Sequence, residues 1–347
     1  MPTTVSLIAG KLDDLTTLPL LGPNLDAIVN SANNHLLTPG ATGIAGAIRD
    51  LGGPSVQHAC DAEKARAGGE VALGHAVWTT SGELGCRCGI AHAVTLRYTP
   101  QREPTTPEAV ASAFQAALAL ADAHGARRLA CYVMCARPGY STVSGDDAPR
   151  VMLGAMLTVL ATWAEPPPSA EGDGGDRRVY LFVPTDAADG VPRLLLRGLA
   201  AAPPSATLGG GTAAVRPPLV WWCDSSLGRK GPAFERLRAA GVVLELLLED
   251  NASVLERAGA GPMPWALVTC RSRPLRAAAT AEPTAGVALL EALGGRVPGP
   301  KVLYCGGEPD AACRVGGWLA GASWVTHDLP RVEALLLASL AVAEGCE

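Results

Sequence analysis

Polar side chains and a glycine-bearing loop near the amino terminus have the residue types of an anion-binding site. The segment Asp26–Asn33 reads DAIVNSAN, and the loop after it ends in Gly43. The apolar run Ala27–Val29 is typical of a strand buried on both faces, and Ala45–Leu51 is expected to form the first turns of a helix. A strand, a glycine loop and a helix N-terminus together present backbone N–H groups and a positive helix end to an anion.

The length and the charge of the chain limit its number of domains and the kinds of partner that it can bind. Its 347 residues suffice for two domains, and 48% of them are hydrophobic. The net charge of −5 argues against bulk electrostatic binding of nucleic acid, but it leaves a local basic groove open. The amino terminus has no basic segment followed by a long apolar run, and no uncharged apolar stretch of about 18 residues occurs. We therefore expect no signal peptide, no membrane span and a cytoplasmic location.

The ten cysteines are scattered, and Cys86 and Cys88 are the only close pair. Disulfide scaffolds are short and dense in cysteine, which this chain is not. We therefore expect reduced and mostly buried thiols. A zinc site formed by Cys86, Cys88 and His92 would have a spacing unlike that of structural zinc sites. The sequence thus predicts no metal and no other cofactor.

Strands and helices alternate in the first half of the chain, which predicts an α/β sheet with helices on both faces. The predicted strands are 27–30, 75–79, 89–94, 128–134 and 179–184, and the predicted helices are 43–51, 55–67, 106–124, 148–164 and 190–200. The Pro- and Gly-rich segment 165–176 is interpreted as an inserted loop, because a strand and a helix follow it. A nearly uncharged stretch rich in Pro, Gly, Ala and Thr is the predicted linker, 203–218, between domains 1–202 and 219–347.

Five strands, each followed by a helix, are predicted in the second half, and this pattern is typical of a flavodoxin-like α/β domain. The predicted strands are 219–223, 242–248, 265–270, 301–304 and 323–326, and the predicted helices are 232–240, 251–258, 284–293, 309–319 and 330–343.

The first hundred residues resemble the macrodomain family. The segment Asp26–Asn33 with its glycine loop and helix matches the family signature, and four further blocks follow in the family's order. These blocks are GGP at 52–54, GEV at 69–71, GHAVWTT at 74–80 and GIAHAV at 89–94. The resemblance implies a three-layer α/β/α fold with a mixed sheet that binds ADP-ribose or a related ligand. Some macrodomains also hydrolyse ADP-ribosyl bonds.

The resemblance also implies roles for the polar residues of the signature. Asp26, followed by Ala27, is implied to accept a hydrogen bond from the adenine amino group, and the alternative is a solvated residue or a local cap. Asn33 is implied to contact the distal ribose and, in hydrolytic members, to position the substrate, so it is the catalytic candidate. The alternative for Asn33 is a loop amide bonded to backbone. Asn30 either belongs to the ligand site or braces the loop.

The first phosphate loop both matches and departs from the family. Gly43 is placed so that the loop can wrap a diphosphate, with the N–H groups of Ile44 and Ala45 facing the ligand. The loop 38–43 has lost most of the usual glycine run, and Pro39 removes an N–H donor. Position 45 is alanine, whereas one hydrolase subclass carries aspartate there. Since other hydrolytic macrodomains have alanine, this difference leaves hydrolysis open.

The second phosphate loop, CARPGYST at 135–142, departs further from the family pattern. We favour the register that places Tyr140 on the aromatic residue that closes the distal ribose pocket, between Gly139 and Ser141. The second glycine of the family pattern is missing. Arg137 either compensates by pairing with a phosphate oxygen or lies on a solvated loop.

The second half resembles a degenerate response-regulator receiver domain. Asp224 follows the first predicted strand, where receivers carry acidic residues for Mg²⁺. The phospho-accepting aspartate expected after the third strand is missing, because 268–272 reads VTCRS, and THD at 326–328 replaces the expected lysine. The resemblance therefore implies a receiver-like domain that cannot form an aspartyl phosphate and that binds Mg²⁺ weakly. Such a domain would serve protein contacts or specificity.

Three functions follow from these observations. The chain either binds ADP-ribose or an ADP-ribosylated target, or removes ADP-ribose from protein or nucleic acid as a hydrolase, or is a scaffold whose nucleotide pocket has decayed. The mechanism proposed for hydrolytic macrodomains positions a water near the phosphates and needs no strong base, so the sequence does not separate the first two functions. The expected partners are an ADP-ribosylated macromolecule and a protein that contacts the second domain, with no membrane.

Overall fold

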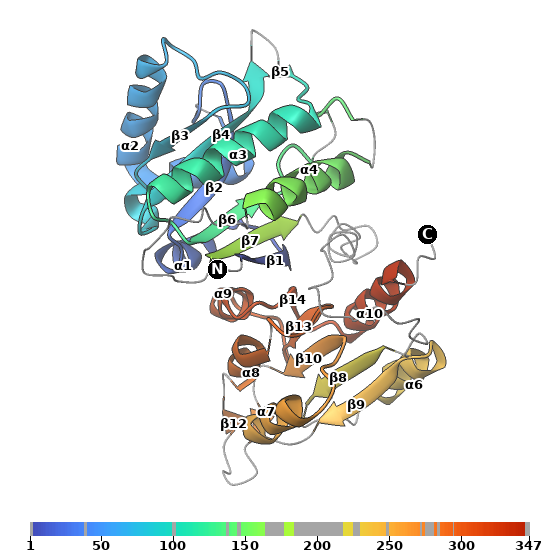
Figure 1. Cartoon of the computed structure of the whole chain (residues 1–347). Coiled ribbons are helices and arrows are strands. Elements are labelled where there is room, and N and C mark those ends of the chain that lie inside the picture. Colours follow the sequence, from blue (N-terminus) through green and yellow to red (C-terminus); the bar gives the residue numbers. More distant parts are fainter. Residues whose placement is uncertain are drawn as a thin grey trace. The chain divides into compact units, whose positions relative to one another are not determined.

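The computed structural model of the chain contains two compact units, 1–184 and 185–347 (Figure 1). The structure describes residues 3–37, 40–98, 102–136, 139–143, 147–163, 177–183, 218–224, 230–247, 250–270, 273–274, 281–282, 285–293 and 295–343. The predicted helix 190–200, the predicted inserted loop 165–176 and the predicted linker up to residue 217 lie outside the described residues.

Unit 1 is an α/β unit built on a mixed sheet of seven strands. From one edge to the other the strands are β1 (Thr3–Ala9), β7 (Arg177–Val183), β6 (Arg128–Tyr132), β2 (Ala27–Asn33), β4 (Gly89–Tyr98) and β3 (Ala76–Thr79). The first five of these run parallel, and β3 pairs antiparallel with β4. The short strand β5 (Arg102–Glu103) pairs antiparallel with the far end of β4. This arrangement confirms the predicted α/β class with a mixed sheet.

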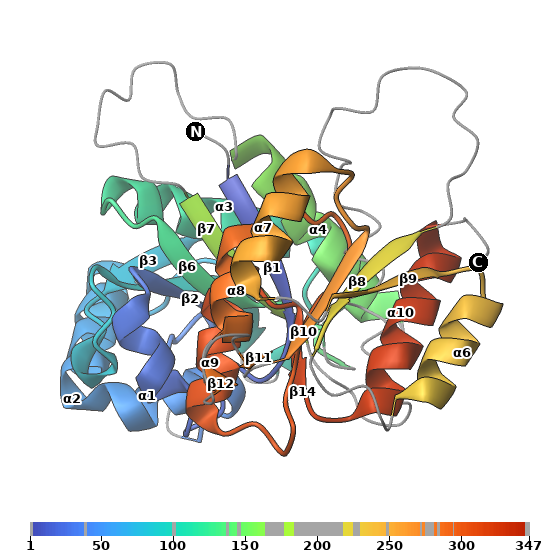
Figure 2. The same cartoon turned by 90° about the horizontal axis from the view of Figure 1, so that it is seen from below.

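Helices cover both faces of this sheet. Figures 1 and 2 show α3 (Pro107–Ala123) and α4 (Asp147–Trp163) together on one face, and α1 (Leu18–Leu21) and α2 (Gly43–Arg66) on the other. Two short 3₁₀ helices, η1 (Gly22–Asn24) and η2 (Gly82–Leu84), complete the unit among its described residues.

The local sequence explains where two of these helices begin and bend. Helix α3 begins after Thr106, whose hydroxyl accepts a hydrogen bond from Ala109 N at 3.2 Å, and Pro107 occupies its first turn. The predicted helices 43–51 and 55–67 form one element, α2, with a kink at Gly53. Gly53 has φ +72°, and Pro54 has no N–H to donate, so the regular hydrogen bonding is interrupted there.

Unit 2 is an α/β unit with five parallel strands. Across the sheet the strands are β14 (Trp324–Thr326), β13 (Lys301–Tyr304), β10 (Ala266–Cys270), β8 (Leu219–Cys223) and β9 (Val243–Leu247). The helices between and after them are α6 (Gly231–Ala239), α7 (Asn251–Ala260), α8 (Ala285–Leu293), α9 (Ala311–Leu319) and α10 (Leu329–Ala343). Each predicted strand and helix of this half is confirmed in place. A small antiparallel pair, β11 (Arg273–Pro274) and β12 (Ala281–Glu282), was not predicted.

No helix in the described part of the chain is long and apolar enough to cross a membrane.

Candidate functional site

The carboxyl ends of the parallel strands meet at one edge of the unit 1 sheet, which we call the carboxyl edge. In α/β folds this edge is where ligands bind. Strand β2 ends there at Asn33, and α2 begins at Gly43, which has φ +64°. The Thr42 side chain stands at the N-cap position but makes no capping hydrogen bond within the described structure. The first N–H groups of α2 therefore have the geometry of an anion site.

Gly46 allows the loop to pass close to this helix end. A Cβ atom at Gly46 would lie 2.6 Å from the carbonyl oxygen of Ala41, which is too close for any other residue without movement of the backbone. Ile44 is buried, and Gly43 and Ala45 are half-buried. The loop and the first turn of α2 thus pack tightly, with Gly46 at a point of close approach to the loop.

Asn33 forms the turn that leads out of β2. Its Oδ1 accepts a hydrogen bond from His35 N at 2.8 Å, and its carbonyl oxygen accepts one from Leu36 N at 2.9 Å. The side chain is half-buried, so its Nδ2 is the group that is left to donate to a ligand at the edge. The next residue, Asn34, is buried and bonds to Glu70 and to the backbone of Tyr98.

Asn30 lies in the interior between β2, β4 and α2. Its Nδ2 lies 3.1 Å from His92 Nδ1, and His92 Nε2 lies 2.8 Å from the Thr79 hydroxyl and 3.7 Å from the Cys60 sulfur. Burial lowers the pKa of His92 from 6.5 to about 4, so the ring is neutral at pH 7. Of the two roles left open for Asn30, this geometry favours bracing.

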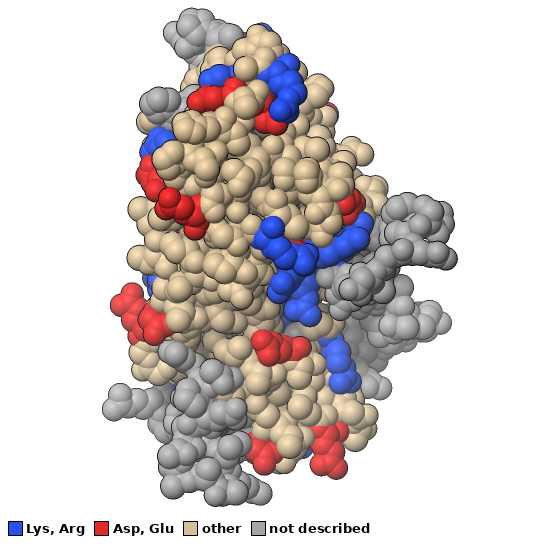
Figure 3. Space-filling view, turned by 90° about the vertical axis from the view of Figure 1, so that its left-hand side faces the viewer, with Lys and Arg blue, Asp and Glu red and all other residues tan. Residues whose placement is uncertain are grey.

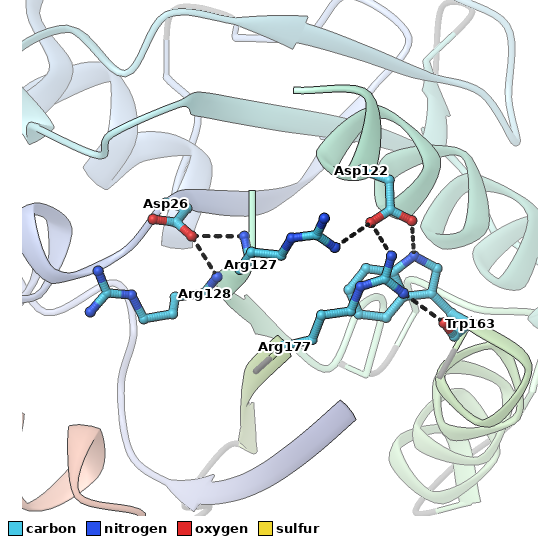
Figure 4. Close-up of polar contacts among 6 residues, drawn as sticks. All are labelled: Asp26, Asp122, Arg127, Arg128, Trp163 and Arg177. Atoms are coloured by element: carbon cyan, nitrogen blue, oxygen red, sulfur yellow. Dashed lines mark hydrogen bonds and ion pairs between the residues drawn. The ribbon is translucent and has the colours of Figure 1, made fainter. Parts of the chain in front are cut away.

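Asp26 immediately precedes β2, so it lies at the amino edge of the sheet, at the opposite end of the strand from Asn33. Figure 4 shows its carboxylate facing the turn at Arg127 and Arg128. Its Oδ2 accepts hydrogen bonds from the backbone N–H groups of Arg127 and Arg128 at 2.7 and 2.9 Å, and its Oδ1 lies 3.0 Å from Arg87 Nε. The carboxylate is 1% exposed. Seven residues of strand separate it from Asn33 by roughly 20 Å. The geometry favours the local cap that the sequence left as the alternative for Asp26.

The second loop follows β6, which pairs with β2, so the two loops lie at neighbouring positions of the carboxyl edge. The described segment 139–143 is held to Thr105, whose N–H donates to Tyr140 O at 3.0 Å and whose carbonyl accepts from Thr142 N at 2.8 Å. Gly139 is exposed with φ +74°, and Tyr140 is half-buried. Ser141 is buried and donates to Val143 O at 3.0 Å.

Arg137 lies outside the described residues, as do Thr38 and Pro39 in the first loop. The register in which Tyr140 faces the ribose therefore stays a prediction.

The structure adds one carboxylate that the sequence analysis missed. Asp13 follows β1 at the carboxyl edge, where its Oδ1 accepts a hydrogen bond from the Tyr132 hydroxyl at 2.9 Å. That hydroxyl also accepts from Leu12 N at 2.9 Å, and burial raises the pKa of Tyr132 above its usual value. Because β1 was not predicted, no sequence pattern placed Asp13 beside the end of β6.

The described residues contain no group of three or more histidine, cysteine or acidic side chains that could hold a metal ion. Of the zinc alternative, His92 has both ring nitrogens engaged by Asn30, Thr79 and Cys60.

In unit 2 the acidic residue singled out by the sequence is already paired. Asp224 follows β8, is buried, and forms an ion pair with Lys230, whose ammonium lies 4.9 Å from the centre of the Tyr304 ring. Burial lowers the pKa of Lys230. Cys270 ends β10 in register with Tyr304 on β13. The carboxylate that the receiver resemblance would assign to Mg²⁺ is thus paired with an ammonium group.

Residues 29–151 match the family model of the Macro domain. Similar solved structures include an Oceanobacillus iheyensis macrodomain with MES bound (20% identity, 52% of this chain and 84% of that chain, TM-score 0.39). They also include the macro domain of ganglioside-induced differentiation-associated protein 2 (20% identity, 52% of this chain and 77% of that chain, TM-score 0.36). A third is a Trypanosoma brucei macrodomain in complex with ADP-ribose (24% identity, 51% of this chain and 63% of that chain, TM-score 0.35). A search of curated proteins gives no match. The macrodomain resemblance is confirmed over the matched residues, and the receiver resemblance of the second half stays a prediction.

Proposed function

We propose that unit 1 is a macrodomain that binds ADP-ribose, or a target that carries it, at the carboxyl edge of its sheet. The observation that carries the proposal is the Macro domain match together with the position of the α2 N-terminus beside the end of β2. Macrodomains among the similar structures were determined with ADP-ribose bound, which supports the choice of ligand.

In this proposal the diphosphate lies against the N–H groups of Gly43, Ile44 and Ala45 at the positive end of α2. Gly43 has a left-handed backbone, with φ +64°, which glycine adopts without strain and which supports a sharp turn of the loop into α2. Asn33 Nδ2 donates to a ribose hydroxyl, and the ring of Tyr140 closes the ribose side of the pocket. Gly139 and Ser141 complete the second loop, with Arg137 as a further phosphate contact.

Asp26 and its neighbour Ala27 are left out of this site, because the Asp26 carboxylate is buried at the other end of β2 and bonded to backbone. We propose that Asp13 supplies the carboxylate that can accept from the adenine amine. It is half-buried at the correct edge, and its second oxygen can accept a further hydrogen bond.

The test is calorimetric titration of the full chain with ADP-ribose, with AMP and ADP as controls. We expect micromolar binding of ADP-ribose and much weaker binding of AMP. The Asn33→Ala variant should bind about 2- to 13-fold more weakly, since one hydrogen bond contributes about 0.5–1.5 kcal/mol. Asn24→Ala is the matched control, because Asn24 is exposed on η1 before the start of β2. Absence of both heat and thermal shift with ADP-ribose would reject the proposal in favour of a decayed pocket.

A hydrolase remains the second candidate, because Asn33 Nδ2, which has no hydrogen-bond partner among the described residues, lies at the edge where a substrate ribose would be positioned. The assay is release of ADP-ribose from a mono-ADP-ribosylated protein or oligonucleotide. Turnover that is lost in Asn33→Ala would assign the hydrolase. Tight binding with no turnover would assign a binding module.

For unit 2 we propose a flavodoxin-like domain that serves contacts or specificity and is not phosphorylated. Its strand order, numbered along the chain, is 2-1-3-4-5, the order of the doubly wound flavodoxin type. Cys270 ends the third strand, and Lys230 neutralises Asp224. Incubation with acetyl phosphate and Mg²⁺ should leave the protein mass unchanged. A stable addition of phosphate to unit 2 would contradict this interpretation.

A further inference from the structure

Four arginines gather at the amino edge of the unit 1 sheet, opposite the proposed ADP-ribose site. Arg128 and Arg178 are exposed and lie side by side in register on β6 and β7. Arg127 immediately precedes Arg128, and Arg87 lies two residues before β4, with 65% of its side chain exposed. Figure 3 shows a cluster of basic side chains on this side of the molecule. We call these four residues the arginine edge.

The carboxylates beneath the arginine edge do not cancel its charge. Asp26 and Asp122 are the two described acidic residues that bond to it, and Asp122 also binds the buried Arg177 at 2.7 Å. The four arginines of the edge and Arg177 together carry five positive charges, and the two carboxylates carry two negative charges. The net local charge of this group is therefore +3. A local excess of this size on a chain of net charge −5 is a focused positive field rather than a general one.

The same carboxylates hold three of the four arginines, Arg87, Arg127 and Arg128, in place. Asp26 fixes the backbone of the turn at Arg127 and Arg128 through two hydrogen bonds. Asp122 lies 3.7 Å from Arg127 and also accepts from Trp163 Nε1 at 2.8 Å (Figure 4). Since the backbone of these residues is already ordered, binding of a phosphate there requires little further loss of chain entropy.

An aromatic pair lies beside the arginine edge. His124 follows α3 and precedes Arg127 by three residues. His124 is an exposed residue, and one face of its ring is stacked on Trp78 of β3, with ring centres 4.3 Å apart and planes 5° from parallel. A cationic groove combined with an exposed ring for stacking is the way in which proteins bind single-stranded nucleic acid. An acidic peptide would use the guanidinium groups but would gain nothing from the ring.

We propose that the arginine edge and the His124 ring bind single-stranded nucleic acid, with the guanidinium groups on phosphates and a base stacked on the imidazole. This surface is separate from the carboxyl edge, and the proposal does not depend on ADP-ribose binding. The negative net charge limits long-range attraction, so the affinity is expected to be modest and to depend strongly on salt.

The experiment is fluorescence anisotropy of a labelled 20-nucleotide oligo-dT with the full chain at several salt concentrations. Four phosphate contacts on a single strand give a slope of about −2.8 in log K against log salt, or about 50-fold weaker binding at 200 mM than at 50 mM. The double variant Arg128→Gln, Arg178→Gln should halve the slope, to about −1.4, so that binding becomes only about 7-fold weaker between 50 and 200 mM salt. The control Arg66→Gln, Arg150→Gln removes two exposed arginines that pair with acids on α2 and α4 and should leave the slope unchanged.

The aromatic pair is tested separately from charge. His124→Ala should weaken binding about fivefold or more without changing the salt slope, since stacking is independent of counterion release. His124→Phe keeps a ring against Trp78 and should restore the affinity.

No binding at 50 mM salt, or equal effects of the two double variants, would overturn the proposal. So would competition by polyglutamate as strong as by unlabelled oligonucleotide, because it would assign an acidic protein to the surface. ADP-ribose titrations of the same variants distinguish failure here from failure of the proposed function, because the two sites lie at opposite edges.

Discussion

Replacing Asp26 by alanine is expected to destabilise unit 1 and to leave the affinity of the folded protein for ADP-ribose unchanged. The carboxylate is buried, and its Oδ2 accepts the backbone N–H groups of Arg127 and Arg128 at 2.7 and 2.9 Å. It thereby joins the start of β2 to the start of β6. Alanine would leave both N–H groups without this acceptor.

The magnitude follows from these contacts. Hydrogen bonds to a charged acceptor contribute about 1.5–3 kcal/mol each, so the two together contribute about 3–6 kcal/mol. The Arg87 side chain is 65% exposed, and its ion pair adds at most about 1 kcal/mol. Because water can reach the turn at Arg127 after the substitution, we expect the lower end, about 3 kcal/mol. For a unit of this size that corresponds to about 6–12 °C in Tm.

The assay is urea unfolding combined with hydrogen exchange resolved by peptide, which assigns the loss to unit 1. Asp26→Asn keeps one acceptor oxygen and should lose about half as much as Asp26→Ala. Arg87→Gln, the control for the ion pair, should change stability by less than about 1 kcal/mol. An unchanged unfolding midpoint together with a tenfold loss of ADP-ribose affinity would refute the reasoning and return Asp26 to the ligand site.

Three further predictions concern the interior of the two units. Burial lowers the pKa of His92 to about 4, from 6.5 in the unfolded chain. The free energy of unfolding should therefore be at its full value above pH 6.5 and should fall by up to about 3 kcal/mol as the pH drops toward 4. Urea midpoints measured across this range should become flat in His92→Gln. Gly286→Ala should destabilise unit 2 by about 3 kcal/mol in chemical denaturation, because the new Cβ would collide with the carbonyl oxygen of Cys270. The control is Gly316→Ala, whose Cβ meets open space, and it should stabilise unit 2 by up to about 1 kcal/mol. Burial raises the pKa of the Cys60 thiol to about 12, so iodoacetamide at pH 8 should alkylate this thiol only after the protein unfolds. Peptide mass spectrometry measures the labelling, and alkylation of Cys60 in the folded protein would contradict its burial.

The regular elements could be predicted because their local signals agree with their burial. Strand β8 is the apolar run LVWWC, and α3 carries a threonine cap and a proline in its first turn. Strand β1 was missed, because TTVSLIA mixes hydroxyl residues with apolar ones at the end of the chain. It is held by pairing with β7, more than 170 residues away, which no local pattern can indicate. The two-residue strands β5, β11 and β12 were missed for the same reason.

The candidate site was only partly predictable, because a strand separates residues that are close in sequence. Asp26 and Asn33 belong to one signature, yet they cap opposite ends of β2. Asp13 reaches the carboxyl edge only through the pairing of β1, and it could not be found without that strand. The glycine loop and the start of α2 lay within one continuous segment, so the anion geometry at Gly43 could be foreseen.

The arginine edge has no sequence signature, because its members come from three segments that meet only when β4, β6 and β7 align. Because Asp26 contacts the arginine edge, the single variant Asp26→Ala can separate nucleic-acid binding at this edge from ADP-ribose binding at the carboxyl edge. Asp26 bonds to the backbone of two of these arginines and lies far from the carboxyl edge. If both assignments hold, Asp26→Ala should weaken oligonucleotide binding by loosening the turn and leave ADP-ribose binding intact. A ligand role for Asp26 requires the reverse pattern, so the two titrations decide which edge of the sheet this carboxylate serves.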